Sequence, residues 1–554
     1  MSDDGVDDDG ISEEVDDADR RLLFISFVLL MCEVVKTLIK SFKWHCLPTA
    51  GGCILVGFFS GLASNMMIPA FDVDKHLNFD DGLFLCMLLP AIVFEAALSG
   101  NKTVFRKRRL SILMFAVTGT IVSTLLTGFM VYYFLLWFST IKIPLLDSLI
   151  FGALISSIDP VAILSVLKSL NFSETDTIFV LVFGESLLND AISITVFHSL
   201  ARRCNADEWD WDFVWEILID FLLAGFGSIL VAMFCAGLSL LYFHTFRNLI
   251  NPPMEVASFF IWALIPYYIC DGLEWSGIVA LVTMGVILDF YVSGTKVEEE
   301  NIMEGHQEFN NNVPFVSIEG TPSTAPVNFF PEDFSIGSED ATLPTYATQN
   351  LVFRQFKYRM TSDAYSHIRF VATCMAHLSE NAIFAFLGLF LFSKTNDWDI
   401  SLVWISIVSC VLGRVLMVKL ISTATWLIHL VFRCAGVTVD KRRPPSEAIV
   451  AIQDPKVQLV LVLAGLRGAV SLALVESLSE YNEFDDCGTM YKPELKVMTS
   501  SSIIFTMFVF GGSAHCILKK LGLGEMNKEF EVTHIPEEKN YASTSPSLRY
   551  SSVA

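Results

Sequence analysis

The chain has 554 residues, of which 53% are hydrophobic and 18% charged, with a mean hydropathy of +0.53. Soluble domains average roughly 45–50% apolar and about 25% charged residues, so much of this chain's apolar surface has to face lipid. A net charge of −23 argues against nucleic acid as a partner. The composition predicts an all-α, polytopic membrane protein.

The N-terminal segment 1–21 is strongly acidic, with ten Asp and Glu residues among the first 20. A run of like charges repels itself, so we expect residues 1–21 to be a disordered, non-cytoplasmic N-terminus. No basic stretch precedes the first apolar run, which argues against a cleaved signal peptide. The first span is therefore expected to be retained.

Long apolar runs predict the membrane spans, because a helix needs about 20 residues to cross the roughly 30 Å hydrocarbon core. We expect about thirteen spans, nine of them within residues 22–293 and four within residues 363–520. The predicted ranges are 22–40, 47–66, 82–99, 109–138, 145–168, 175–200, 212–243, 254–271, 275–293, 365–394, 400–432, 456–477 and 496–518.

Lysine and arginine concentrate in the loops after odd-numbered spans, as in residues 106–109 and 441–443. Because positive loops stay cytoplasmic, this asymmetry predicts an outside or lumenal N-terminus and a cytoplasmic C-terminus. Residues 294–362 are predicted to be a long, disordered cytoplasmic loop and residues 521–554 a short cytoplasmic tail. Whether Cys204 and Cys487, both in non-cytoplasmic loops, form a disulfide stays open.

A cluster of polar side chains lies in the middle of the predicted span 175–200. A charge at bilayer depth costs at least about 2.5–3.5 kcal/mol, so an intramembrane carboxylate indicates function. Glu185 and Asn189 are four residues apart, as are Ser186 and Asp190, and we expect all four on one stripe of the helix. Hard oxygen ligands of this kind suit Na⁺ or a proton rather than a soft transition metal.

Two other spans carry signals for a broken helix. Asp159 precedes Pro160 in span 145–168, and two glycines flank Arg467 in span 456–477. Proline removes a backbone donor and glycine weakens a helix, so both spans are predicted to be discontinuous. The ends of such half-helices carry partial charges that Asp159, near amide ends, and Arg467, near carbonyl ends, would neutralise.

Four stretches of the sequence carry a family resemblance: SSIDPVAIL, VFGESLLNDAISI, HLSENAIFAFLGL and LAGLRGAVSLAL. They resemble the sodium/proton exchanger family of cation–proton antiporters, closer to its endosomal or organellar subgroup. The resemblance implies thirteen spans in two inverted repeats, crossing broken helices at spans 5 and 12, and a homodimer. The long loop and the short tail depart from the family, so a calcium-binding regulatory partner stays open.

The resemblance also assigns roles to individual residues in the ion site. Asp190 matches the carboxylate that alternately holds Na⁺ and a proton, with Asn189 beside it. Ser186, Asp159 and the backbone carbonyl of Ile158 match the remaining coordination positions. An Asn-Asp pair is what the family's electroneutral exchangers carry.

A supporting charge network is implied in the same way. Glu185 resembles the acid that pairs with an arginine, here Arg414, and Arg467 matches the arginine of the second broken helix. Three further polar residues inside predicted spans are candidates for the ion path or for structural roles: Glu95, Glu380 and Asn381.

The expected function is secondary active, electroneutral exchange of Na⁺, or K⁺, for protons by alternating access, with no cofactor and no enzymatic activity. Membrane lipids and a second copy of the chain are the expected partners. A transport-dead or channel-like sensor with the same fold is the alternative. An intramembrane aspartyl hydrolase using Asp159 and Asp190 is disfavoured, because its glycine-aspartate signatures are absent. The membrane of residence, endosomal, organellar or plasma, stays open.

Overall fold

The computed structural model describes residues 8–42, 44, 47–67, 87–99, 111–170, 172–173, 176–202, 211–246, 251–293, 362–391, 398–434, 453–479 and 488–522. Within these residues every regular element is a helix. The first part of the chain contains α1 (Asp8–Ser41), α2 (Thr49–Met67), α5 (Leu89–Ser99), η2 (Met114–Gly119), α7 (Thr120–Phe138), α8 (Leu145–Ser156), α9 (Val161–Ser169), α10 (Thr177–Ala201), α11 (Trp211–Thr245), α12 (Pro252–Gly272), α13 (Gly277–Leu288) and η3 (Asp289–Ser293).

The second part contains α16 (Ser362–Phe390), α17 (Ile400–Cys434), α19 (Pro455–Leu463), α20 (Ala469–Glu476), α21 (Lys492–Phe505), η4 (Thr506–Gly511) and α22 (Gly512–Lys520). Each predicted span overlaps one of these helices or a broken pair of them. Among the described residues, eight helical stretches are long and apolar enough to cross a membrane by length and composition. The predicted all-α membrane fold is therefore confirmed.

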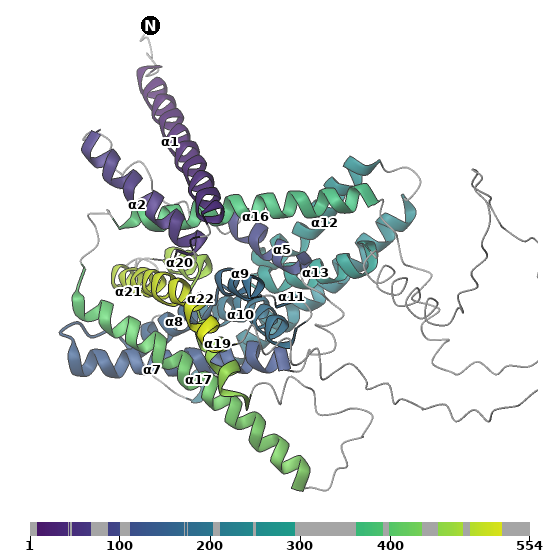
Figure 1. Ribbon diagram of the computed structural model, residues 1–554. Helices are drawn as coiled ribbons and strands as arrows, with labels where there is room; N and C mark the ends of the chain where they lie inside the picture. Colours follow the sequence, from purple (N-terminus) through teal and green to yellow (C-terminus); the bar gives the residue numbers. More distant parts are fainter. Residues whose placement is uncertain are drawn as a thin grey trace, which may run out of the picture.

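The broken helices lie at the centre of the molecule (Figure 1). Helices α8, α9, α10, α19 and α20 occupy this centre, while α11, α12 and α13 pack together on one side of it. The long helix α16 runs across the molecule and packs against α2, α5 and α12. It therefore links the N-terminal helices α1 and α2 to the group around α12.

Helix α1 begins earlier than the sequence predicted. It runs from Asp8 to Ser41 and so includes most of the acidic segment 1–21, which we expected to be disordered. Residues 11–21 contain neither Gly nor Pro. Once the apolar part of the helix has formed, each further residue extends it at little cost, because the expensive step is nucleation. The prediction of disorder is therefore wrong for residues 8–21.

Two helices stop in the middle of apolar ranges and then restart. Helix α8 ends at Ser156 and α9 starts at Val161, while α19 ends at Leu463 and α20 starts at Ala469. The two breaks touch, because the amide nitrogen of Asp159 donates a hydrogen bond to the carbonyl oxygen of Leu466 at 2.9 Å. Both predicted interruptions are present, and they lie against each other.

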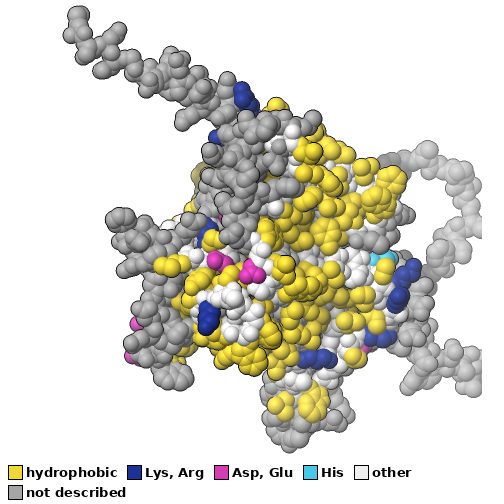
Figure 2. Space-filling model, turned by 90° about the vertical axis from the view of Figure 1, so that its left-hand side faces the viewer, with side chains coloured by type: hydrophobic (Ala, Val, Ile, Leu, Met, Phe, Trp, Pro, Cys, Tyr) yellow, Lys and Arg dark blue, Asp and Glu magenta, His cyan; other side chains and the backbone are white. Residues whose placement is uncertain are grey.

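On the face shown in Figure 2, hydrophobic side chains make up most of the coloured surface of the described residues. Long apolar side chains are exposed along α11, including Leu222, Phe226, Leu230, Met233 and Phe234. An apolar surface of this extent is unfavourable in water and suits the hydrocarbon of a bilayer. The chain is a multi-pass membrane protein.

Some predictions concern parts of the chain outside the described residues. These parts are residues 294–361 of the predicted loop, residues 523–554 of the predicted tail, and Cys204 and Cys487. The loop, the tail and the disulfide therefore stay predictions.

Candidate functional site

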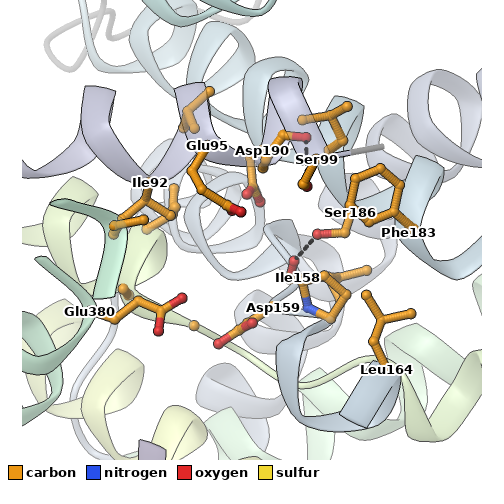
Figure 3. Close-up of a pocket in the computed structure, with 18 of the residues that line it drawn as sticks. Ile92, Glu95, Ser99, Ile158, Asp159, Leu164, Phe183, Ser186, Asp190 and Glu380 are labelled. Carbon is orange, nitrogen blue, oxygen red and sulfur yellow. Dashed lines mark hydrogen bonds between the residues drawn. The ribbon is translucent and has the colours of Figure 1, made fainter. Parts of the chain in front are cut away.

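A cavity of about 530 Å³ lies between α5, α9, α10 and α16, next to the break that separates α8 from α9. Four carboxylates line it: Glu95 on α5, Asp159 in the break, Asp190 on α10 and Glu380 on α16. Figure 3 shows these side chains directed toward the same space. The fold thus gathers acids that are far apart in the sequence.

The break after α8 supplies oxygen atoms around Asp190. Ser157 leaves the helix with a ψ of 137°, and its Oγ donates a hydrogen bond to Oδ1 of Asp190 at 2.6 Å. Oγ of Ser186 donates to the carbonyl oxygen of Ile158 at 2.7 Å. With Asp159 also on the cavity wall, carboxylate, hydroxyl and carbonyl oxygens meet at one end of the cavity.

Asn189 does not share the face of Asp190. Its Nδ2 donates to the carbonyl oxygen of Ser156 at 2.8 Å, and its Oδ1 accepts a hydrogen bond from Thr120 on α7 at 2.5 Å. Consecutive residues of an α-helix are rotated by about 100°, so Asn189 faces α7 and the end of α8 while Asp190 faces the cavity. The single stripe predicted for residues 185–190 is therefore wrong, because it divides into a cavity row and a row turned to neighbouring helices.

Glu185 belongs to the second row and forms a buried ion pair with Arg414 of α17. Nη1 of Arg414 lies 2.6 Å from Oε1 of Glu185, and Nη2 lies 3.2 Å from Oε2. The same guanidinium donates from Nε and Nη2 to the carbonyl oxygen of Leu461, near the end of α19. The predicted pairing is thus present, and it brings positive charge to a helix end that carries partial negative charge.

Arg467 lies in the break between α19 and α20 and is 0% exposed. Its Nη1 donates to the carbonyl oxygen of Ser157 at 3.3 Å, and its Nε contacts Sγ of Cys410 at 3.2 Å. Carbonyls at the C-terminal end of a helix lack intrahelical partners, so a cation is favoured there. The guanidinium therefore lies near the carbonyl end of α8, as the sequence predicted.

The glycines on either side of Arg467 leave room for charged side chains. A Cβ atom on Gly465 would lie 2.9 Å from Cγ of Arg414, and one on Gly468 would lie 2.5 Å from Cβ of Asp159. Real Cβ contacts are essentially never shorter than 3.0 Å. Both glycines thus allow the second break to pack closely against the residues of the charge network.

The three residues considered for the ion path separate in the structure. Glu95 and Glu380 line the cavity. Asn381 is fully buried outside the cavity wall, and its Nδ2 donates to Oε1 of Glu33 on α1 at 2.5 Å. Of the two roles left open for Asn381, its position favours the structural one, because α16 turns it toward α1.

Sequence reasoning missed Ser157 and Thr120. The sequence did carry a signal for Ser157, which stands two residues before Asp159 at a predicted break. Backbone polar groups at the end of a helix lack intrahelical hydrogen-bond partners. Thr120 had no such signal, because it lies in a continuous apolar span and meets Asn189 only when α7 packs against α10.

The donor set around Asp190 can bind an alkali cation or a proton. Carboxylate, hydroxyl and carbonyl oxygens are hard ligands, and a carboxylate also accepts a proton. In the part of the chain that the structure describes, no group of three or more His, Cys, Asp or Glu side chains could hold a metal ion.

A family model described as the transmembrane part of sodium/hydrogen exchangers matches residues 25–318 and 351–520, which is most of the chain. The chain belongs to the sodium/hydrogen exchanger family. This family member is 26% identical over 512 residues to human sodium/hydrogen exchanger 8, covering 91% of this chain and 71% of that one. It is 25% identical over 475 residues to the endosomal/prevacuolar sodium/hydrogen exchanger of Saccharomyces cerevisiae, covering 85% and 62%.

The exchanger is also similar to a solved structure, that of the sodium proton antiporter MjNhaP1 from Methanocaldococcus jannaschii. The TM-score is 0.59 at 15% sequence identity, with 91% of this chain and 99% of that chain covered. At this identity the likeness shows the fold alone, which is the antiporter fold predicted from the motifs. The relatives agree with the endosomal or organellar subgroup that the motifs favoured.

Proposed function

We propose that this protein is a secondary active antiporter that exchanges Na⁺, or K⁺, for protons, with Asp190 binding the cation and the proton in turn. Family membership and the sodium/hydrogen exchangers among its relatives support Na⁺/H⁺ exchange. The observation that carries the assignment to Asp190 is its position on the cavity wall, beside a break that supplies further oxygen atoms.

A bound Na⁺ would take its oxygen ligands from both sides of the break. We propose Asp190 and Ser186 on α10, with Asp159 and the carbonyl of Ile158 in the break itself. All four residues line the cavity. The hydroxyl of Ser186 now donates to the carbonyl of Ile158 and would have to rotate away when a cation binds.

Coupling follows from competition for one carboxylate. A proton on Asp190 removes the negative charge and turns an acceptor oxygen into a donor, so the proton and the cation exclude each other. One Na⁺ exchanged for one proton moves no net charge across the membrane. Exchange by this scheme is therefore electroneutral, and neither Asn189 nor Glu185 is needed as a ligand.

The exposed lysines on the cavity lining agree with an inward-facing state. Lys40, Ser99 and Lys168 line the cavity near the ends of α1, α5 and α9. In the orientation predicted from the positive residues, these helix ends face the cytoplasm. We propose that the broken helices and α10 move relative to α16 to expose Asp190 on the other side, as in transporters with a site between two halves.

The test is cation-driven proton flux in proteoliposomes, with Na⁺, K⁺ and Li⁺ compared and the voltage clamped by valinomycin. Asp190→Asn should abolish saturable flux, whereas Asp147→Asn should retain it. Asp147 is a matched control because it is also buried, in the first turn of α8, yet lies outside the cavity wall. Flux that persists in Asp190→Asn would overturn the assignment. Folded wild type without flux would support the sensor instead, and flux that does not saturate would support a channel.

A further inference from the structure

Helix α1 carries three charged residues near the cavity, of which only Lys40 lines its wall, and the proposed exchange uses none of them. Glu33, Lys36 and Lys40 are three and four positions apart, so they share one face of the helix. Helix α1 packs against α16. Glu33 accepts the hydrogen bond from Asn381, while Lys40 lines the cavity itself.

Lys36 reaches Glu380 from behind the cavity wall. Its Nζ lies 3.7 Å from Oε2 of Glu380, a charge contact that is longer than a hydrogen bond. Lys36 is only 7% exposed and does not line the cavity, whereas Glu380 does. The carboxylate in Figure 3 therefore faces the cavity with a fixed positive charge on its other side.

Other charged groups share this part of the cavity. Nδ1 of His377 lies 3.7 Å from the same Oε2 of Glu380. The charged and titratable groups that line the cavity from the surrounding elements are Lys40, Glu95, Asp159, Lys168, Asp190 and His377. Of these, three are carboxylates and two are lysines. The charge state of Glu380 therefore changes the net charge of the cavity wall that a cation meets.

We propose that Lys36 determines the cation affinity of the exchanger by neutralising Glu380, so that the cavity binds one cation at Asp190 and does not retain a second one at Glu380. The inference rests on the proposed function. A cleft lined by one sign of charge and by low-dielectric walls concentrates counter-ions. Without Lys36, Glu380 adds an uncompensated negative charge to the cavity wall. A cation held at Glu380 then delays the release of cations from the cavity.

The experiment measures Na⁺-driven proton flux for Lys36→Met, Glu380→Gln and the double variant. Lys36→Met should lower the Km for Na⁺ about tenfold, because the uncompensated charge of Glu380 accumulates cations in the cavity. It should also lower the maximal rate, because the second cation leaves slowly. Adding Glu380→Gln should return the Km to the wild-type value. Because His377 contacts the same oxygen, the comparison is repeated at acidic and at alkaline pH.

Two variants serve as controls for fold and charge. Lys36→Arg keeps the charge and should keep the wild-type Km. Arg202→Gln removes the positive partner of Glu274, an ion pair of 4.0 Å whose side chains are 36% and 80% exposed, and should leave transport unchanged. Where Lys36→Met does not fold, Lys36→Gln replaces it, because it retains a polar side chain at the same position.

An unchanged or raised Km in Lys36→Met, or a low Km that persists in the double variant, would overturn the proposal. A purely structural Lys36 predicts less folded protein or a lower rate, but not tighter binding. Equilibrium dialysis with radioactive Na⁺ gives an independent readout, with one ion bound by wild type and a second in Lys36→Met. Dialysis does not depend on transport. Wild type that fails to exchange would contradict the proposed function, and the number of Na⁺ ions bound would still test the role of Lys36.

Discussion

Ser157 donates its hydroxyl hydrogen to Asp190, with Oγ and Oδ1 2.6 Å apart across the space between the helix break and α10. The bond ties the first residue after α8 to the proposed ion-binding carboxylate. The same carboxylate lines the cavity, where a ligand can reach it.

Replacing Ser157 by Ala should therefore weaken cation binding. A hydrogen bond to a charged group contributes about 1.5–3 kcal/mol, so we expect the Km for Na⁺ to rise about tenfold or more. Ser199→Ala is the matched control, since that hydroxyl is also buried but donates to the carbonyl of Thr195 within its own helix and lies outside the cavity wall. Flux measured against Na⁺ concentration checks the prediction, and equal Km values for the two variants would contradict it.

A methyl group at Gly468 should block transport. Its Cβ would lie 2.5 Å from Cβ of Asp159, so the two breaks would have to separate. Overpacking of this kind costs about 1–3 kcal/mol, and we expect at least a tenfold loss of exchange rate from protein that still folds. Gly225→Ala on α11 is the control, because nothing lies within 4 Å of its added Cβ. Wild-type flux in Gly468→Ala would show that the close contact is not required.

The ion pair between Glu185 and Arg414 should govern stability. Removing one partner of a buried pair typically costs about 3–5 kcal/mol, because the other charge is left uncompensated. Arg414→Met should therefore lower the unfolding temperature in detergent more than Glu185→Gln combined with Arg414→Met. Arg202→Gln, in an exposed pair, should change it little. A double variant that is less stable than Arg414→Met would contradict this reasoning.

Competition for one carboxylate also fixes the pH dependence of exchange. The apparent Km for Na⁺ should rise as the pH on the cavity side falls, because protons occupy the group that the cation needs. In the acidic range the rise should approach about tenfold per pH unit, since one proton displaces one cation. The maximal rate at saturating Na⁺ should stay constant. A rate that changes with pH at constant Km would indicate a proton that acts elsewhere.

The positions of most helices were predictable from apolar length alone. The predicted span 212–243 corresponds to α11, Trp211–Thr245. Pro160 and Gly468 marked the two breaks, because both residue types disfavour a continuous helix. The start of α1 was not predictable in this way, because local repulsion and helix propagation oppose each other and the sequence does not say which is stronger.

The candidate site was predictable in its residue types but not in its orientation. Asp190 and Asp159 stood out because a carboxylate in an apolar span is energetically costly and therefore indicates a function. The rotation that turns Asn189 away from the cavity depends on where Thr120 and the end of α8 pack. Lys36 was similarly hidden, since its contact with α16 joins segments far apart in the chain.

The most direct measurement is proton release when Na⁺ binds to purified protein in weakly buffered detergent solution, followed with a pH indicator. If Asp190 holds either a proton or a cation, wild type and Asp147→Asn should release one proton for each Na⁺ bound within the titration range, and Asp190→Asn should release none. Na⁺ binding by wild type without proton release, or undiminished release by Asp190→Asn, would contradict the proposed competition at this carboxylate.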